Sequence, residues 1–237
     1  MSETRIVFVH GIDGFGAAAW PAQHLLAGRY DCLFLKRTGF DAIEPPKATD
    51  FAADAQIVLK ELGRGGHVVA HSQGAIAAMM AAVQRPDLVH SLILIEPLLP
   101  SLTADHPATA AYSTHLADLV ARSRVLSDEE FLAEFNTLMA VVTAPGTEPR
   151  RRVAARARLQ APATDAPLHI IPGVPTTVIT GGWEPLYEEV AEYLGATGAH
   201  HIVHRSGHRP QDTSDGAALI ERLIEAAVAS RQGWQRA

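Results

Sequence analysis

The chain has 237 residues, of which 47% are hydrophobic and 19% are charged, with a formal net charge of −6 and a single cysteine, Cys32. This apolar fraction excludes a disordered chain, and the negative charge disfavours nucleic acid as the main partner. No apolar run reaches the roughly 18 residues of a membrane span, and no secretory leader is recognisable. One cysteine excludes an internal disulfide framework and a Cys/His zinc cluster. We therefore expect one cytoplasmic domain, residues 1–237, without a metal, a membrane partner or a nucleic-acid partner.

Short apolar runs alternate with helical patterns along the chain. The runs predicted to be strands are 5–9, 30–35, 67–70, 91–95, 176–180 and 201–204. The patterns predicted to be helices between and after them are 17–27, 50–62, 73–83, 186–194 and 217–229. Nearly continuous apolar strands separated by helices indicate an α/β fold, with a mostly parallel sheet of about six strands and helices on both faces.

The alternation breaks once, between Pro97 and Leu168, where helical patterns cover 109–120 and 127–142. A connection of this length inside a compact domain usually carries function, so residues 97–168 are predicted to be a helical lid inserted after the strand ending at Ile95. Its Ala-rich and Leu-rich content predicts an apolar pocket and an apolar small-molecule substrate. The basic cluster Arg150–Arg158 is interpreted as a solvated helix face rather than a grip on a phosphate-bearing substrate.

A serine follows the third predicted strand, in Ala70-His71-Ser72-Gln73-Gly74, and a predicted helix comes directly after it. This segment approximates G-x-S-x-G, the nucleophile elbow, with Ala70 in place of the first glycine. Small residues are needed because large side chains would collide across so sharp a turn. The N-terminus of the following helix would direct its N–H groups and dipole at developing negative charge. Ser72 is therefore the candidate nucleophile.

With this turn and the His10-Gly11 pair that ends the first strand, the chain resembles the α/β-hydrolase fold superfamily, from Arg5 to about Ala229. The resemblance implies a serine hydrolase of the small bacterial esterase, lactonase or thioesterase type, which needs no cofactor. It also implies that the backbone N–H groups of Ile12 and Gln73 form the oxyanion hole.

His208 is the candidate general base among twelve histidines. It lies in a loop between the last predicted strand and the final helix, which is where the hydrolase family resembled here places its base. The chain order of serine, acid and histidine is then preserved. His10 and His71 flank the same site but resemble family positions with packing and turn roles.

Two carboxylates compete for the role of the triad acid. Glu96 directly follows the strand ending at Ile95 and precedes the rigid Pro97, a position that the acid takes in some relatives, including certain haloalkane dehalogenases. Glu184 follows Gly181-Gly182-Trp183 and matches the family pattern G-x-x-D/E. A buried carboxylate at the end of a central strand suits the task of orienting a histidine, so Glu96 is favoured over Glu184.

The resulting hypothesis is a cofactor-independent hydrolase that cleaves a carboxylic ester, thioester or lactone through an acyl-enzyme. A serine nucleophile disfavours an epoxide hydrolase or dehalogenase that uses an aspartate. Two alternatives stay open: a lyase or cyclase that tailors a metabolite on the same fold, and a weakly catalytic ligand-binding protein. The sequence determines neither the substrate nor the oligomeric state.

Overall fold

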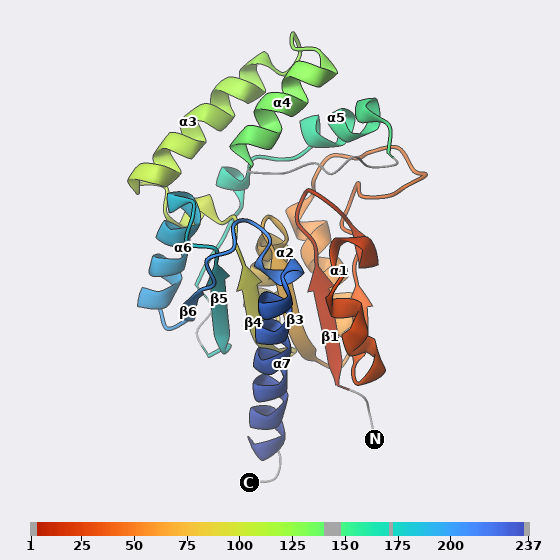
Figure 1. Cartoon of the computed structure of the whole chain (residues 1–237), viewed down its shortest axis with the longest axis vertical. Helices are drawn as coiled ribbons and strands as arrows, with labels where there is room; N and C mark the ends of the chain where they lie inside the picture. Colours follow the sequence, from red (N-terminus) through yellow and green to blue (C-terminus); the bar gives the residue numbers. More distant parts are fainter. Residues whose placement is uncertain (1–3, 140–147, 171–172, 235–237) are drawn as a thin grey trace.

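A computed structural model describes residues 4–139, 148–170 and 173–234, and it shows one sheet flanked by helices (Figure 1). The strands are β1 Arg5–Val9, β2 Asp31–Phe34, β3 Gly66–His71, β4 Val89–Ile95, β5 Thr176–Thr180 and β6 His200–Val203. The helices are α1 Phe51–Leu62, α2 Gly74–Gln84, α3 Pro107–Arg122, α4 Asp128–Leu138, α5 Arg150–Arg158, α6 Pro185–Ala196 and α7 Ser214–Trp234. Every strand lies within one or two residues of its predicted run.

The sheet has the order β2-β1-β3-β4-β5-β6, and all of its strand pairs are parallel. The predicted α/β fold with a six-stranded parallel sheet is thereby confirmed. Because all strands run in the same direction, their carboxyl ends lie along one edge of the sheet (Figure 1). Residues that follow the strands are therefore gathered there.

Alternation along each strand divides the core between the two faces of the sheet. In β1, Val7 and Val9 belong to the core on the face covered by α1 and α2, whereas Ile6 and Phe8 belong to the core on the opposite face, which includes Ile220 of α7. The strands are apolar on both faces because helices exclude water from both.

One predicted helix is wrong. Residues 17–27 form two short 3₁₀ helices, Gly16–Ala19 and Gln23–Gly28, instead of one continuous helix. Pro21 accounts for the interruption, because proline lacks an N–H donor and disfavours the helical conformation in the residue before it. Trp20 accordingly has φ −133° and ψ 59°.

Helices α3, α4 and α5 are inserted between β4 and β5, and they lie beyond the carboxyl ends of the strands (Figure 1). The predicted helix 127–142 corresponds to α4, which ends at Leu138; residues 140–142 fall outside the described residues. Among the helices described, none combines the length and the apolar character needed to cross a membrane. The insertion leaves a helical layer facing the sheet edge at which Ser72 lies.

Candidate active site

Ser72 occupies a sharp turn between β3 and α2. Its φ of +52° lies in the left-handed region, which residues with side chains rarely adopt. Gly74 permits the turn, because a Cβ there would lie 2.4 Å from the His10 carbonyl oxygen. Gly11 permits the close approach of the loop after β1, since its Cβ would lie 3.0 Å from the Cβ of Ser72. Ala70, which replaces the first glycine of the elbow pattern, is fully buried within β3.

Glu96 lies beside Ser72 because of the register between their strands. His71 of β3 pairs with Ile95 of β4, so the residue after each strand end is Ser72 on one side and Glu96 on the other. Glu96 is completely buried and has a φ of +45°, a second left-handed conformation at a residue other than glycine. Such conformations cluster at functional sites, where the surrounding structure must hold them.

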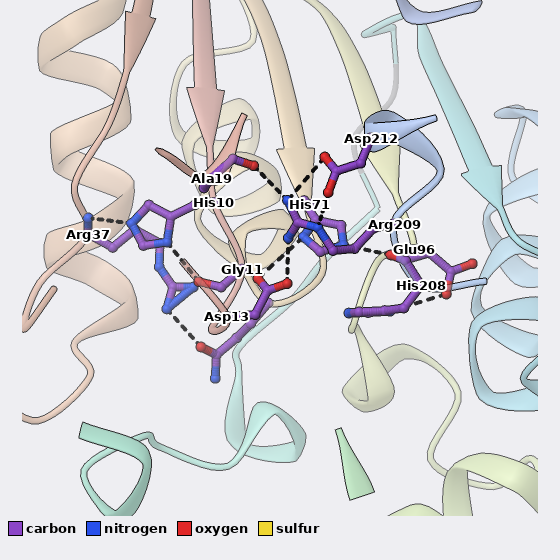
Figure 2. Close-up of polar contacts among 11 residues, drawn as sticks. His10, Gly11, Asp13, Ala19, Arg37, His71, Glu96, His208, Arg209 and Asp212 are labelled. Carbon is purple, nitrogen blue, oxygen red and sulfur yellow. Dashed lines mark hydrogen bonds and ion pairs between the residues drawn. The ribbon is translucent and has the colours of Figure 1, made fainter. Parts of the chain in front are cut away.

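The structure shows which of the two candidate carboxylates lies against His208. The His208 Nδ1 atom is 3.3 Å from Oε2 of Glu96 (Figure 2). Glu184 instead caps the N-terminus of α6, where its side chain accepts a hydrogen bond of 3.4 Å from the Leu186 N–H. The side chain of His208 is only 7% exposed and that of Glu96 is 0% exposed, so little water screens this pair.

Two further donors hold the Glu96 carboxylate. The backbone N–H of Gly181 donates to Oε1, and the indole Nε1–H of Trp183 donates to Oε2 at 2.9 Å. Sequence reasoning missed both contacts. A buried carboxylate needs such partners, but no local pattern shows that Trp183 would supply one.

The backbone N–H groups predicted to form the oxyanion hole belong to loops that meet at Ser72. Ile12 lies in the loop that Gly11 brings against Ser72, and Gln73 precedes the first turn of α2. Neither N–H donates a hydrogen bond to another residue that the structure describes. The side chain of Gln73 is held by the buried Arg37, whose Nη2 donates to Oε1 at 2.7 Å.

A polar network joins the loop after β1 to the loop of His208 (Figure 2). His71 Nε2 donates to the backbone carbonyl of His208 at 2.9 Å. Arg209 forms an ion pair with Asp13 and donates to the Ala19 carbonyl oxygen at 2.8 Å. The chain positions of these residues are too far apart for sequence reasoning to have paired them, and the tertiary fold brings them together.

Burial keeps the two flanking histidines neutral. Desolvation, with a smaller contribution from His208, lowers the pKa of His71 to about 3. Desolvation and the neighbouring Arg37 lower the pKa of His10 to about 3, and its Nε2 accepts a hydrogen bond of 3.1 Å from the Arg37 N–H. Burial alone would raise the pKa of Asp13, but the facing charges of Arg209 and of His71 when protonated lower it to about 2. These environments agree with packing roles for His10 and His71.

Two cavities lie beside this arrangement. The larger, of about 720 Å³, opens between α3, α4 and the start of α6, and its wall includes Trp183 and Tyr187. The same two rings lie 6.2 Å and 5.2 Å, between centroids, from the ring of His208. A smaller cavity of about 70 Å³ is lined mainly by apolar residues of α3, α4 and α5 and is bordered by Gln73.

The basic cluster on α5 is engaged in ion pairs. Its pairs are Arg150 with Glu129, Arg152 and Arg156 with Glu148, and Arg158 with Asp128. These ion pairs connect α5 to α4 and to Glu148, and they support a structural role for the cluster over binding of a phosphate group. Within the described ranges, no three His, Cys, Asp or Glu side chains are grouped to hold a metal ion.

Known proteins resemble this chain in sequence. The chain matches the Alpha/beta hydrolase family over residues 6–222. It is 31% identical over 96 residues to 2-(acetamidomethylene)succinate hydrolase of Mesorhizobium japonicum, a match that spans 38% of this chain and only 34% of that protein's length.

Solved structures share the fold at low sequence identity. A carboxylesterase of Nitrososphaera gargenis aligns with a TM-score of 0.61 and 15% identity, over 96% of this chain and 92% of that one. The enol-lactonase of Burkholderia xenovorans LB400 aligns with a TM-score of 0.59 and 16% identity, over 97% of this chain and 92% of that one.

Proposed function

Because the chain belongs to the alpha/beta hydrolase family, we propose that it cleaves a carboxylic ester, thioester or lactone through an acyl-enzyme on Ser72. One observation carries the proposal. Ser72 lies on a strained turn at the carboxyl edge of the sheet, beside a buried Glu96 whose carboxylate lies 3.3 Å from His208 Nδ1. A hydroxyl nucleophile, an imidazole base and a dehydrated carboxylate are the groups that acyl transfer requires.

In the proposed reaction, Ser72 Oγ attacks the carbonyl carbon while His208 Nε2 takes its proton. Glu96 holds the proton on Nδ1, which leaves Nε2 free to accept, and it stabilises the imidazolium that forms. The N–H groups of Ile12 and Gln73 receive the oxyanion, and in a well-studied protease one such donor contributes about 2.7–4 kcal/mol. His208 then protonates the leaving group, and water attacks the acyl-enzyme in the reverse sense.

The larger cavity supports an organic substrate of moderate size. Its volume of about 720 Å³ lies within the roughly 300–1,000 Å³ that small-molecule sites span. Trp183 and Tyr187, which line this cavity, also lie next to the ring of His208, so the cavity adjoins the proposed base. Among the similar proteins, the hydrolase of Mesorhizobium japonicum, the carboxylesterase and the enol-lactonase agree with a carbonyl substrate.

Labelling with a fluorophosphonate, followed by intact-mass measurement, tests the proposal. The wild type is expected to gain one adduct, and Ser72→Ala is expected to gain none. An absence of adduct on folded wild-type protein would contradict an activated serine and would favour the lyase, cyclase or ligand-binding alternatives. A positive result justifies a panel of esters, thioesters and lactones to identify the substrate.

A further inference from the structure

Trp183 shares an acceptor atom with His208. Its indole Nε1–H donates to Glu96 Oε2 at 2.9 Å, and the same oxygen lies 3.3 Å from His208 Nδ1. The Gly181 N–H occupies the other carboxylate oxygen, Oε1. Three donors from two segments of the chain therefore surround one buried carboxylate.

The two glycines before Trp183 provide the space for its indole. A Cβ on Gly181 would lie 2.6 Å from Trp183 Cδ1 and 2.3 Å from the Gly207 carbonyl oxygen. Gly182 has a φ of +65°, and its Cβ would lie 2.7 Å from a methyl group of Val203. A side chain at Gly181 would displace the indole or the loop that carries His208, and one at Gly182 would displace Val203 of β6, so both glycines are needed where Trp183 begins.

The indole is not held there by burial. Trp183 is 41% exposed, an unusual exposure for so large an apolar side chain, and it belongs to the wall of the cavity of about 720 Å³. Its ring lies 6.2 Å from that of His208 at an interplanar angle of 72°. The indole N–H thus contacts the acid of the proposed triad, and the same residue lines the space proposed for the substrate.

The hydrogen bond fixes the direction in which Glu96 presents its charge. Without the indole, Oε2 would have only the longer contact to His208, and the Gly181 N–H on Oε1 would be the one remaining donor that restrains the carboxylate. A hydrogen bond to a charged group contributes more free energy than one between neutral groups. The indole N–H therefore restrains the orientation of the carboxylate strongly.

We propose that Trp183 is a positioning residue, which acts on the reaction through Glu96 by holding Oε2 toward His208 Nδ1. The proposal rests on the proposed function, in which Glu96 orients the base. It assigns the Gly181-Gly182-Trp183 segment a role in that mechanism besides lining the cavity.

Trp183→Phe is the direct test, because it removes the N–H donor and keeps an aromatic ring against the cavity. The measured quantity is the second-order rate of Ser72 labelling by a fluorophosphonate, in the wild type and in a Glu96→Ala background. Loss of one hydrogen bond to a charged group predicts a roughly tenfold slower rate in the wild-type background. In Glu96→Ala there is no carboxylate to orient, so Trp183→Phe is expected to change the rate less than twofold.

The pH profile gives a readout that a loss of packing would not move. With one donor fewer, the Glu96 carboxylate is no longer held toward Nδ1 and supports the imidazolium less. The acid limb of the labelling profile is therefore expected to move to lower pH in Trp183→Phe. This measurement needs only the single variant, so it stands even if Glu96→Ala fails to fold.

Three outcomes would overturn the positioning role. They are a Trp183→Phe rate within twofold of the wild type, an unchanged acid limb, and an equal loss in both backgrounds. Failure of the proposed function is distinguishable, because it would show as labelling that persists in Ser72→Ala or is absent from the folded wild type.

Discussion

Replacing Glu96 by glutamine removes the negative charge next to His208 with almost no change in volume. The buried site offers only donors: the Gly181 N–H to one oxygen, and the Trp183 Nε1–H and His208 Nδ1–H to the other. A glutamine amide has one oxygen and one NH₂ group. In either orientation, its NH₂ therefore faces a donor. If it faces Nδ1, His208 must carry its proton on Nε2, and that tautomer cannot accept the proton of Ser72.

The same change at the acid of a serine protease lowers kcat about 10⁴-fold, or about 5.4 kcal/mol of transition-state stabilisation. We expect a loss of fluorophosphonate labelling rate of this order in Glu96→Gln at neutral pH. Burial of the His208–Glu96 pair, at 7% and 0% side-chain exposure, argues against rescue by water.

Glu184→Gln is the matched control. Glu184 is the other carboxylate at this edge of the sheet, and its side chain serves as an acceptor for the Leu186 N–H, a task that a glutamine oxygen also performs. We expect Glu184→Gln to stay within about threefold of the wild-type rate, as for a neutral change remote from the reacting atoms. A large loss in Glu184→Gln together with a loss below tenfold in Glu96→Gln would refute the assignment of the acid.

Three further predictions concern stability, each measured by urea unfolding. Gly74→Ala places a Cβ 2.4 Å from the His10 carbonyl oxygen, so it is expected to lower the free energy of unfolding by about 1–3 kcal/mol, and an unchanged midpoint would contradict that packing. Ser72→Gly is expected to be about 1 kcal/mol more stable than Ser72→Ala, because glycine adopts a φ of +52° without strain; equal stabilities would show that the turn is relaxed. Burial lowers the pKa of His67 from 6.5 to about 4, so below pH 6.5 the unfolded chain takes up a proton that the folded chain refuses. The free energy of unfolding of the wild type should then fall by roughly 1.4 kcal/mol per pH unit from this residue between pH 6.5 and 4, and His67→Gln should show a shallower fall over that range.

The sheet was predictable because its signals are local. Each strand is a short apolar run that must be buried on both faces, and alternation with helices leaves few arrangements other than a parallel sheet. No continuous helix forms over residues 17–27, because the ring of Pro21 interrupts it after Ala19. The prediction gave more weight to the helical pattern of apolar residues than to this proline. The network of Asp13 and Arg209 was invisible in the sequence, since its members are 196 positions apart.

The sequence alone determined the fold class and named a serine turn, a histidine loop and two carboxylates, because each follows a strand and the carboxyl ends of parallel strands share one edge. It favoured Glu96 over Glu184 but did not determine which of them contacts His208, since both follow strands that end there. Only the tertiary structure determined that contact. A hydrogen bond depends on a fraction of an ångström in the path of a loop, and the loop of His208 places Nδ1 at 3.3 Å from Glu96, while Glu184 is turned back to cap α6.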